Sequence, residues 1–245
     1  MSQTAIPPIP DTPSHTRRML LVACGALSLL PTLAAADALD LLSKSDASAG
    51  LREALTKGAD AAVAELGKPG GFLDSDRFRI PLPSALEKAS SAMRMLGMGG
   101  EADELKTAMN RAAEAAVPEA KALLLQAVRS MTVEDAKAIL GGPDDAATQY
   151  FRKATHDQLA VRFQPIVHQE TSRSGLGTAY EKYAGQAAQM HLIDEKDARL
   201  DPYVTEKALD ALYALIADKE KAIRKDPVGQ GSALLGKVFG AALGH

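Results

Sequence analysis

Residues 201–225 read DPYVTEKALDALYALIADKEKAIRK, and this stretch decides the fold class. Asp201 and Pro202 suit the first turn of a helix, because the N–H that proline lacks would have no partner there. Apolar side chains then recur every three or four residues, which is the spacing of one face of an α-helix. Asp226 and Pro227 end the pattern. The apolar face consists of Val204, Ala208, Ala211, Leu212, Leu215, Ala222 and Ile223.

The same periodicity continues through most of the chain, so the sequence predicts an all-α fold with a single compact multi-helix domain. Pro165 is expected to end one helix near Phe163, because proline lacks the N–H that a helix interior needs. Gly175 and Gly177 are expected to form a turn. Further helices are expected at about residues 47–66, 84–96, 101–117, 132–140 and 180–190, with others beginning at Pro118 and at Asp144 or Asp145.

The stretch from Phe72 to Pro83 lacks helical spacing. Residues 77–80, Arg-Phe-Arg-Ile, alternate polar and apolar, which is typical of an extended strand. Pro81 and Pro83 fix their own φ and bias the residues before them toward extended geometry. We therefore expect at most one short extended segment, near residues 76–83, and the pattern leaves open whether it pairs as a strand.

The composition excludes several classes of protein. The 245 residues include 45 alanines, only 4% aromatic side chains and no tryptophan, whereas a β-sandwich or barrel needs many β-branched and aromatic residues. A hydrophobic fraction of 46% with a net charge of −3 argues against intrinsic disorder. The same near-neutral charge argues against a nucleic-acid partner, since such proteins carry a basic surplus.

The N-terminus has the three parts of a secretory signal peptide. Arg17 and Arg18 precede an apolar run from Met19 to Leu30, and three alanines follow before Asp37. We predict a signal peptide over residues 1–36, cleaved between Ala36 and Asp37. The mature chain would then be a helical domain over 37–245, with its core at about 40–225 and a tail at 226–245. It would contain no transmembrane helix and would reside in the periplasm as a soluble protein.

Two alternatives for the same segment stay open. Leu21-Val22-Ala23-Cys24 resembles a lipobox, in which Cys24 would be lipidated and would anchor the protein to a membrane. The apolar run continues past Cys24, which favours cleavage after Ala36. Thr16-Arg17-Arg18 partly matches a twin-arginine export signal, and a paired arginine is also common in general secretory signals.

A series of short phrases along the chain forms a recognisable pattern. The phrases are GLREAL (50–55), IPLP (80–83), MNRAAE (109–114), AVPEA (116–120), MTVEDA (131–136), ILGG (139–142), AATQYF (146–151), YVT (203–205) and IRKDP (223–227). Together these phrases are similar to the exported bacterial family catalogued as domain of unknown function 4197, over roughly Asp40 to Phe239. The resemblance implies a mostly helical protein of the cell envelope in bacteria with an outer membrane, and it implies no activity and no catalytic residue.

Asn110, Arg111 and Glu114 form the first candidate ligand-binding group. Residues three and four apart share one helix face, and Arg111 could hold a carboxylate or phosphate through two parallel hydrogen bonds. The alternative is an Arg–Glu pair that fixes the register of a tight, alanine-lined helix contact. We favour this alternative, because a ligand site needs more convergent groups than one helix presents.

Thr148, Tyr150 and Arg152 form the second candidate group, with His156 one turn further on. A tyrosine, an arginine and a histidine could line a pocket for an anion. The alternative is that Tyr150 anchors the core while the polar side chains face solvent, which the scarcity of aromatic residues favours.

No metal site or cofactor is predicted. Zinc needs three or four convergent ligands, and the closest histidine–carboxylate pairs, His168 with Glu170 and His191 with Asp194, are isolated. A loose methionine group could bind copper(I), but filling gaps in an aromatic-poor core is the favoured interpretation. The group consists of Met93, Met95, Met98 and Met109.

We therefore expect a non-enzymatic binding or interaction domain of the cell envelope, whose partner is an unknown envelope protein or a small ligand. One alternative is a hydrolase or lyase with a polar site around Arg111, Glu114, Tyr150 and His156. Another is a carrier that holds an apolar ligand in a cavity between helices.

Overall fold

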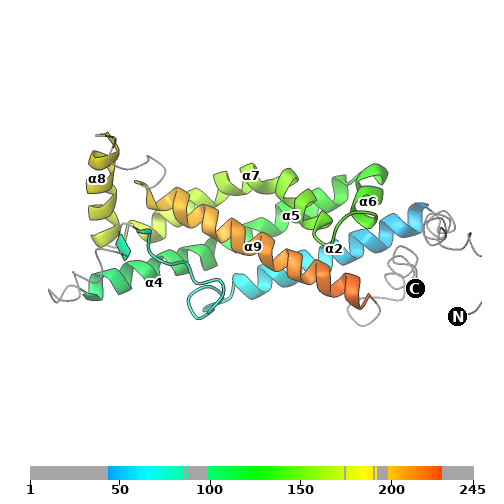
Figure 1. Ribbon diagram of the computed structural model, residues 1–245, viewed down its shortest axis with the longest axis horizontal. Coiled ribbons are helices and arrows are strands. Elements are labelled where there is room, and N and C mark those ends of the chain that lie inside the picture. Colours follow the sequence, from blue (N-terminus) through cyan, green and yellow to red (C-terminus); the bar gives the residue numbers. More distant parts are fainter. Residues whose placement is uncertain are drawn as a thin grey trace, which may run out of the picture.

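Helix α9 (Leu200–Lys225) runs along the molecule and packs against α2, α4 and α7 (Figure 1). The prediction from the sequence is confirmed to within one residue. The apolar face is buried as expected, except that Ala222 is only partly buried. Because α9 contacts helices from both halves of the chain, its buried face organises the core.

The computed structural model describes residues 44–84, 86–87, 99–173, 175–189, 191 and 198–227. Several predictions lie outside these residues. They concern the signal peptide with its cleavage site at Ala36 and Asp37, the lipidation site Cys24, most of the helix at 84–96, the tail from residue 228, and Met93, Met95 and Met98.

The described part of the chain contains helices and no strand, so the all-α, single-domain prediction is confirmed. No helix in that part is both long enough and apolar enough to cross a membrane. The elements besides α9 are α2 (Lys44–Leu66), α4 (Gly99–Ala116), a 3₁₀ turn η1 (Val117–Glu119), α5 (Ala120–Ser130), α6 (Val133–Leu140), α7 (Ala146–Thr171) and α8 (Gly175–Gln189).

Helix α6 begins where a local sequence signal places it. The Thr132 hydroxyl accepts a hydrogen bond from the Asp135 N–H at 3.0 Å, and the Asp135 carboxylate accepts one from the Thr132 N–H at 2.9 Å. This reciprocal capping box satisfies two N–H groups that have no partner inside the helix.

Helix α7 continues through Pro165 to Thr171, so the expected end near Phe163 is wrong. Pro165 is exposed, and the carbonyl that its missing N–H leaves unpaired belongs to Val161, whose side chain is 73% exposed. Water can therefore satisfy that carbonyl. The buried side chains Phe163 and Val167 keep the segment helical on both sides of the proline, because packing outweighs the local cost.

The turn expected at Gly175 and Gly177 is also wrong, because both glycines lie in the first turn of α8. At Gly177 a Cβ atom would lie 2.7 Å from the Thr171 carbonyl oxygen and in contact with Leu105 and Leu200. The missing side chain lets the start of α8 approach the end of α7 closely. In Figure 1, α8 stands across the end of the bundle.

The segment between α2 and α4 is non-helical over residues 67–83, as expected for the stretch from Phe72 to Pro83. Residues 76–83 form a turn and an irregular connector and pair with no strand in the described part of the chain. Phe72, Ile80 and Leu82 nevertheless bury their side chains in the core. The segment therefore lies across the helices as part of the packed structure.

Alanines and a few bulky side chains have different roles in the packing of the core. Ala112, Ala113 and Ala116 on α4 are fully buried, and α4 packs closely against α7. Phe151 and Phe163 on α7 are also fully buried and are among the largest side chains of the core. Small side chains permit close helix approach, while aromatic rings bury large apolar areas.

We predict that Pro165→Ala stabilises the protein by about 1–2 kcal/mol. Alanine restores the hydrogen bond to Val161 and has a much higher helix propensity, and the gain is reduced because the unfolded chain becomes more flexible. Urea unfolding measures the change. The control is Gln164→Ala on the same exposed turn, which should stay within about 0.5 kcal/mol of wild type. A loss of stability in Pro165→Ala would contradict this account.

Candidate functional site

Asn110 on α4 acts as a backbone partner for the non-helical segment. Its side chain is fully buried. The Oδ1 atom accepts a hydrogen bond from the Ile80 N–H at 2.8 Å, and Nδ2 donates to the Ile80 carbonyl at 3.0 Å and to the Lys106 carbonyl at 2.8 Å. One amide thus satisfies both backbone groups of Ile80, as a neighbouring strand would.

Glu114 holds the other end of that segment. Its Oε1 atom accepts hydrogen bonds from the N–H groups of Phe72 at 3.1 Å and Leu73 at 3.0 Å, and Oε2 accepts one from Arg111 Nη1 at 2.6 Å. Burial alone would raise the pKa of Glu114, but hydrogen bonds from the Leu73 backbone, Arg111 and the backbone of Phe72 and Gly70 outweigh it and lower that pKa. Glu114 is therefore an ionised anchor for the backbone of 70–73.

The second candidate group is dispersed over three different partners. Thr148 donates through its N–H and its hydroxyl to Glu220 Oε2, each at 2.9 Å. The Tyr150 hydroxyl donates to the Ala127 carbonyl at 2.8 Å, and Arg152 Nη1 lies 3.1 Å from Asp210 Oδ1. Among the six candidate residues, the polar contacts in the described part of the chain join only Arg111 to Glu114.

His156 links α7 to α9. Its two ring nitrogens lie 3.2 Å from Asp157 Oδ1 and 3.2 Å from Glu206 Oε2. The ring stacks on that of Tyr213, which is buried and shares a hydrogen bond of 2.9 Å with Thr155. Burial lowers the pKa of His156, but hydrogen bonds to Asp157 and Glu206 outweigh it, so the pKa lies above its ordinary value.

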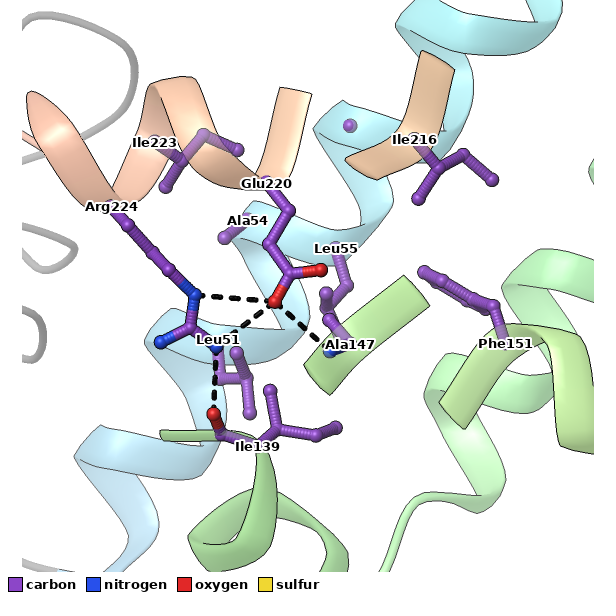
Figure 2. Close-up of a pocket in the computed structure, with 11 residues that line it drawn as sticks. Leu51, Ala54, Leu55, Ile139, Ala147, Phe151, Ile216, Glu220, Ile223 and Arg224 are labelled. Atoms are coloured by element: carbon purple, nitrogen blue, oxygen red, sulfur yellow. Dashed lines mark hydrogen bonds and ion pairs between the residues drawn. The ribbon is translucent and has the colours of Figure 1, made fainter. Parts of the chain in front are cut away.

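Glu220 and Arg224 on α9 form a buried pair that the sequence analysis did not single out (Figure 2). Glu220 Oε1 accepts from Arg224 Nη2 at 2.9 Å and from the Ala147 N–H at 2.9 Å. Arg224 Nη2 also donates to the Ile139 carbonyl at 2.7 Å. The pair therefore provides hydrogen-bond partners both for the backbone N–H at the start of α7 and for a backbone carbonyl at the end of α6.

A cavity of about 20 Å³ adjoins this pair between α2, α7 and α9. Its walls are mostly apolar and include Leu51, Ala54, Phe151 and Ile216 (Figure 2). A space of this size holds about one water molecule. It is far smaller than the roughly 300 Å³ that a small-molecule pocket needs, so it is not the chamber that an apolar-ligand carrier requires.

A larger and open groove, of about 620 Å³, lies between α7, α8 and the start of α9. Helix α7 contributes Val161, Gln164, Pro165 and His168 to its lining. Glu181 comes from α8, and Arg199 and Asp201 come from the start of α9. Three elements thus bring charged and apolar groups to one concave surface, which makes the groove the candidate functional site.

His168 is held in this groove by a carboxylate from another helix. Its Nδ1 atom lies 2.8 Å from Asp201 Oδ2, and Asp201 Oδ1 accepts a hydrogen bond from the Thr171 hydroxyl at 3.0 Å. Asp201 is buried, whereas the His168 side chain is 61% exposed. The sequence neighbour Glu170 pairs instead with Arg173. The sequence analysis missed the pair because its residues are 33 positions apart on separate helices.

Other lining side chains of the groove have no partner of their own. In the part of the chain that the structure describes, the side chains of Gln164, Glu181 and Arg199 make no hydrogen bond or ion pair. Within the same residues, no group of three or more histidine, aspartate or glutamate side chains could hold a metal ion.

Comparison with known proteins identifies the family of the chain. The family described as "Protein of unknown function (DUF4197)" matches residues 41–240, and the chain belongs to this family. No curated protein and no solved structure matches the chain.

We predict that Glu220→Ala destabilises the protein by about 3–5 kcal/mol, because it leaves Arg224 buried without its partner and the start of α7 without acceptors. Urea unfolding measures the loss. Glu65→Ala, which removes the exposed ion pair with Lys219, is the control and should cost at most about 1 kcal/mol. Equal losses in the two variants would refute the importance of the buried pair.

The raised pKa of His156 predicts a pH-dependent contribution to stability. The charged ring is favoured in the folded state, so its contribution is complete below the ordinary histidine pKa of about 6.5 and disappears as the pH rises through the folded-state pKa. We expect His156→Gln to lose stability relative to wild type at pH 5.5, and to lose less at pH 8.5. A histidine NMR titration that placed the pKa of His156 below the ordinary value would contradict the prediction.

Proposed function

We propose that this member of the DUF4197 family is an exported helical domain of the bacterial cell envelope that binds a partner protein or a small ligand without catalysing a reaction. The groove between α7, α8 and α9 is its binding face. The proposal has two parts, export and binding, and each has its own test.

The observation that carries the binding part is a contrast between two sets of polar side chains. Asn110, Glu114 and Thr148 are buried, and their hydrogen bonds go to the protein's own backbone, to Arg111 and to Glu220. In the groove, by comparison, Arg199 and Glu181 are accessible charges without partners among the described residues. Charges that stabilise nothing within the fold, on a concave surface, are free to contact a ligand.

The alternative functions receive less support. A hydrolase or lyase centred on Arg111, Glu114 and Tyr150 would need these groups to converge on one substrate, and their hydrogen bonds point to separate parts of the backbone. A carrier of an apolar ligand would need an interior chamber, and the cavity beside Glu220 has room for about one water molecule.

Export rests on the N-terminal sequence. The paired arginines, the apolar run and the alanines before Asp37 support a soluble periplasmic protein, and the alternative is a lipoprotein anchored through Cys24. Mass spectrometry of the N-terminus of the protein isolated from its host decides between them. A chain that begins at Asp37 supports the soluble form, and a lipidated Cys24 supports the anchored form. An uncleaved Met1 would refute export.

We predict that a ligand or partner copurifies with the protein from its own envelope and is lost when the groove is altered. Native mass spectrometry compares wild type with a double variant, Arg199→Gln and Glu181→Gln. The matched control, Arg129→Gln with Glu134→Gln, removes two exposed charges on α5 and α6 and should retain the ligand. Bound mass retained by the groove variant, or wild type recovered only as free monomer, would overturn the proposal.

A further inference from the structure

The described lining of the groove carries charges of both signs. Arg199 contributes a positive charge from the start of α9, and Glu181 contributes a negative charge from α8. Neither has a partner in the part of the chain that the structure describes. A simple anion near Arg199 would also meet the charges of Glu181 and Asp201, and a simple cation would meet Arg199. The groove therefore discriminates against ligands of one sign.

His168 adds a directed hydrogen-bonding group. The Asp201 carboxylate accepts the Nδ1–H of the ring, which directs Nε2 away from Asp201, where it is an acceptor whenever the ring is neutral. Because Asp201 is itself held by Thr171, the acceptor that orients the ring is in place before a ligand arrives. An acceptor from His168 and a carboxylate from Glu181 together suit a ligand's ammonium group.

Arg199 suits the opposite end of such a ligand. A guanidinium binds a carboxylate through two parallel N–H donors, which gives geometric selectivity as well as charge complementarity. The groove also has an apolar wall, formed by Val161, which is 73% exposed, and by Pro165. That wall provides contact for a hydrocarbon side chain.

We propose that the groove binds a small zwitterionic ligand of the amino-acid or short-peptide class. The ligand's carboxylate lies on Arg199, and its ammonium group lies on Glu181 and His168 Nε2. The groove is open to solvent and offers a volume of about 620 Å³. This inference rests on the proposed function, because it assigns a ligand class to the same groove.

Isothermal titration calorimetry of the full chain tests the class, with glycyl-leucine as the probe. We expect a Kd of about 1 mM or tighter. The N-acetylated dipeptide and the dipeptide amide each lack one charge and should bind about tenfold more weakly or not at all. Inorganic phosphate tests whether any anion suffices, and it should bind more weakly than the dipeptide.

Groove variants locate the two charges of the ligand. Arg199→Gln and Glu181→Gln should each weaken binding of glycyl-leucine about tenfold, whereas the matched controls Arg129→Gln and Glu134→Gln should leave it within about twofold. The circular dichroism spectrum of each variant verifies folding. In NMR spectra of the wild type, the dipeptide should shift the His168 ring signals and leave those of His156 unchanged.

Three outcomes would overturn the proposal. The first is that the dipeptide does not bind, and the second is that the capped dipeptides bind as tightly as the uncapped one. The third is that phosphate binds and that Glu181→Gln strengthens its binding, which would indicate a site for simple anions. If the dipeptide does not bind but the groove variant still loses a copurified ligand, the ligand class is wrong and the proposed function stands. If the dipeptide does not bind and no ligand copurifies with the wild type, the ligand class and the proposed function are both wrong.

Discussion

The buried pair of Glu220 and Arg224 is the interaction on which the arrangement of α6, α7 and α9 depends. The turn between α6 and α7 is short and contains Gly141, Gly142 and Pro143, and Asp145 at the start of α7 makes no side-chain capping bond. The first N–H groups of α7 are buried against α9, where water cannot reach them. Glu220 supplies the missing acceptors, and Arg224 supplies a donor for the end of α6.

Such a pair is costly to bury, because both charges lose their hydration. It is tolerated here because the carboxylate accepts hydrogen bonds from Ala147, Thr148 and Arg224, and these replace water. The same principle recurs at Asn110 and Glu114, and at Arg52 on α2, whose Nη2 atom donates to the Met131 carbonyl at 2.8 Å. In each case a long polar side chain on a helix satisfies the backbone of a connecting segment. A core built mainly from alanine and leucine has few other groups that could do so.

Features encoded over short distances could be predicted from the sequence. Apolar spacing placed α9 and most other helices, and the box formed by Thr132 and Asp135 placed the start of α6, because these signals are local. The expectation at Pro165 was wrong because burial of Phe163 and Val167 outweighs a local penalty, and that burial depends on other helices.

The candidate residues show the same limit. Asn110, Arg111 and Glu114 stood out as polar groups among alanines, and Arg111 pairs with Glu114 at the spacing of one helix face. The backbone groups that Asn110 and Glu114 hold lie 30 and more positions away, in a segment without periodicity. Glu220 and Arg224 have the spacing of a helix pair, and the sequence alone did not indicate that α6 and α7 would bury it. His168 and Asp201 meet only because α7 and α9 pack side by side.

The hydrogen bonds by which two side chains of α4 hold the segment between α2 and α4 limit how the sequence of this protein can change over evolution. Asn110 and Glu114 contact the N–H groups of Phe72, Leu73 and Ile80 and the carbonyl group of Ile80, which are backbone groups that every residue other than proline possesses. An exposed position of that segment such as Asp76 can therefore vary without loss of these hydrogen bonds. The two side chains on α4 cannot, so the constraint falls on the helix and on the buried side chains of the connector, while the exposed positions of the connector are free to diverge.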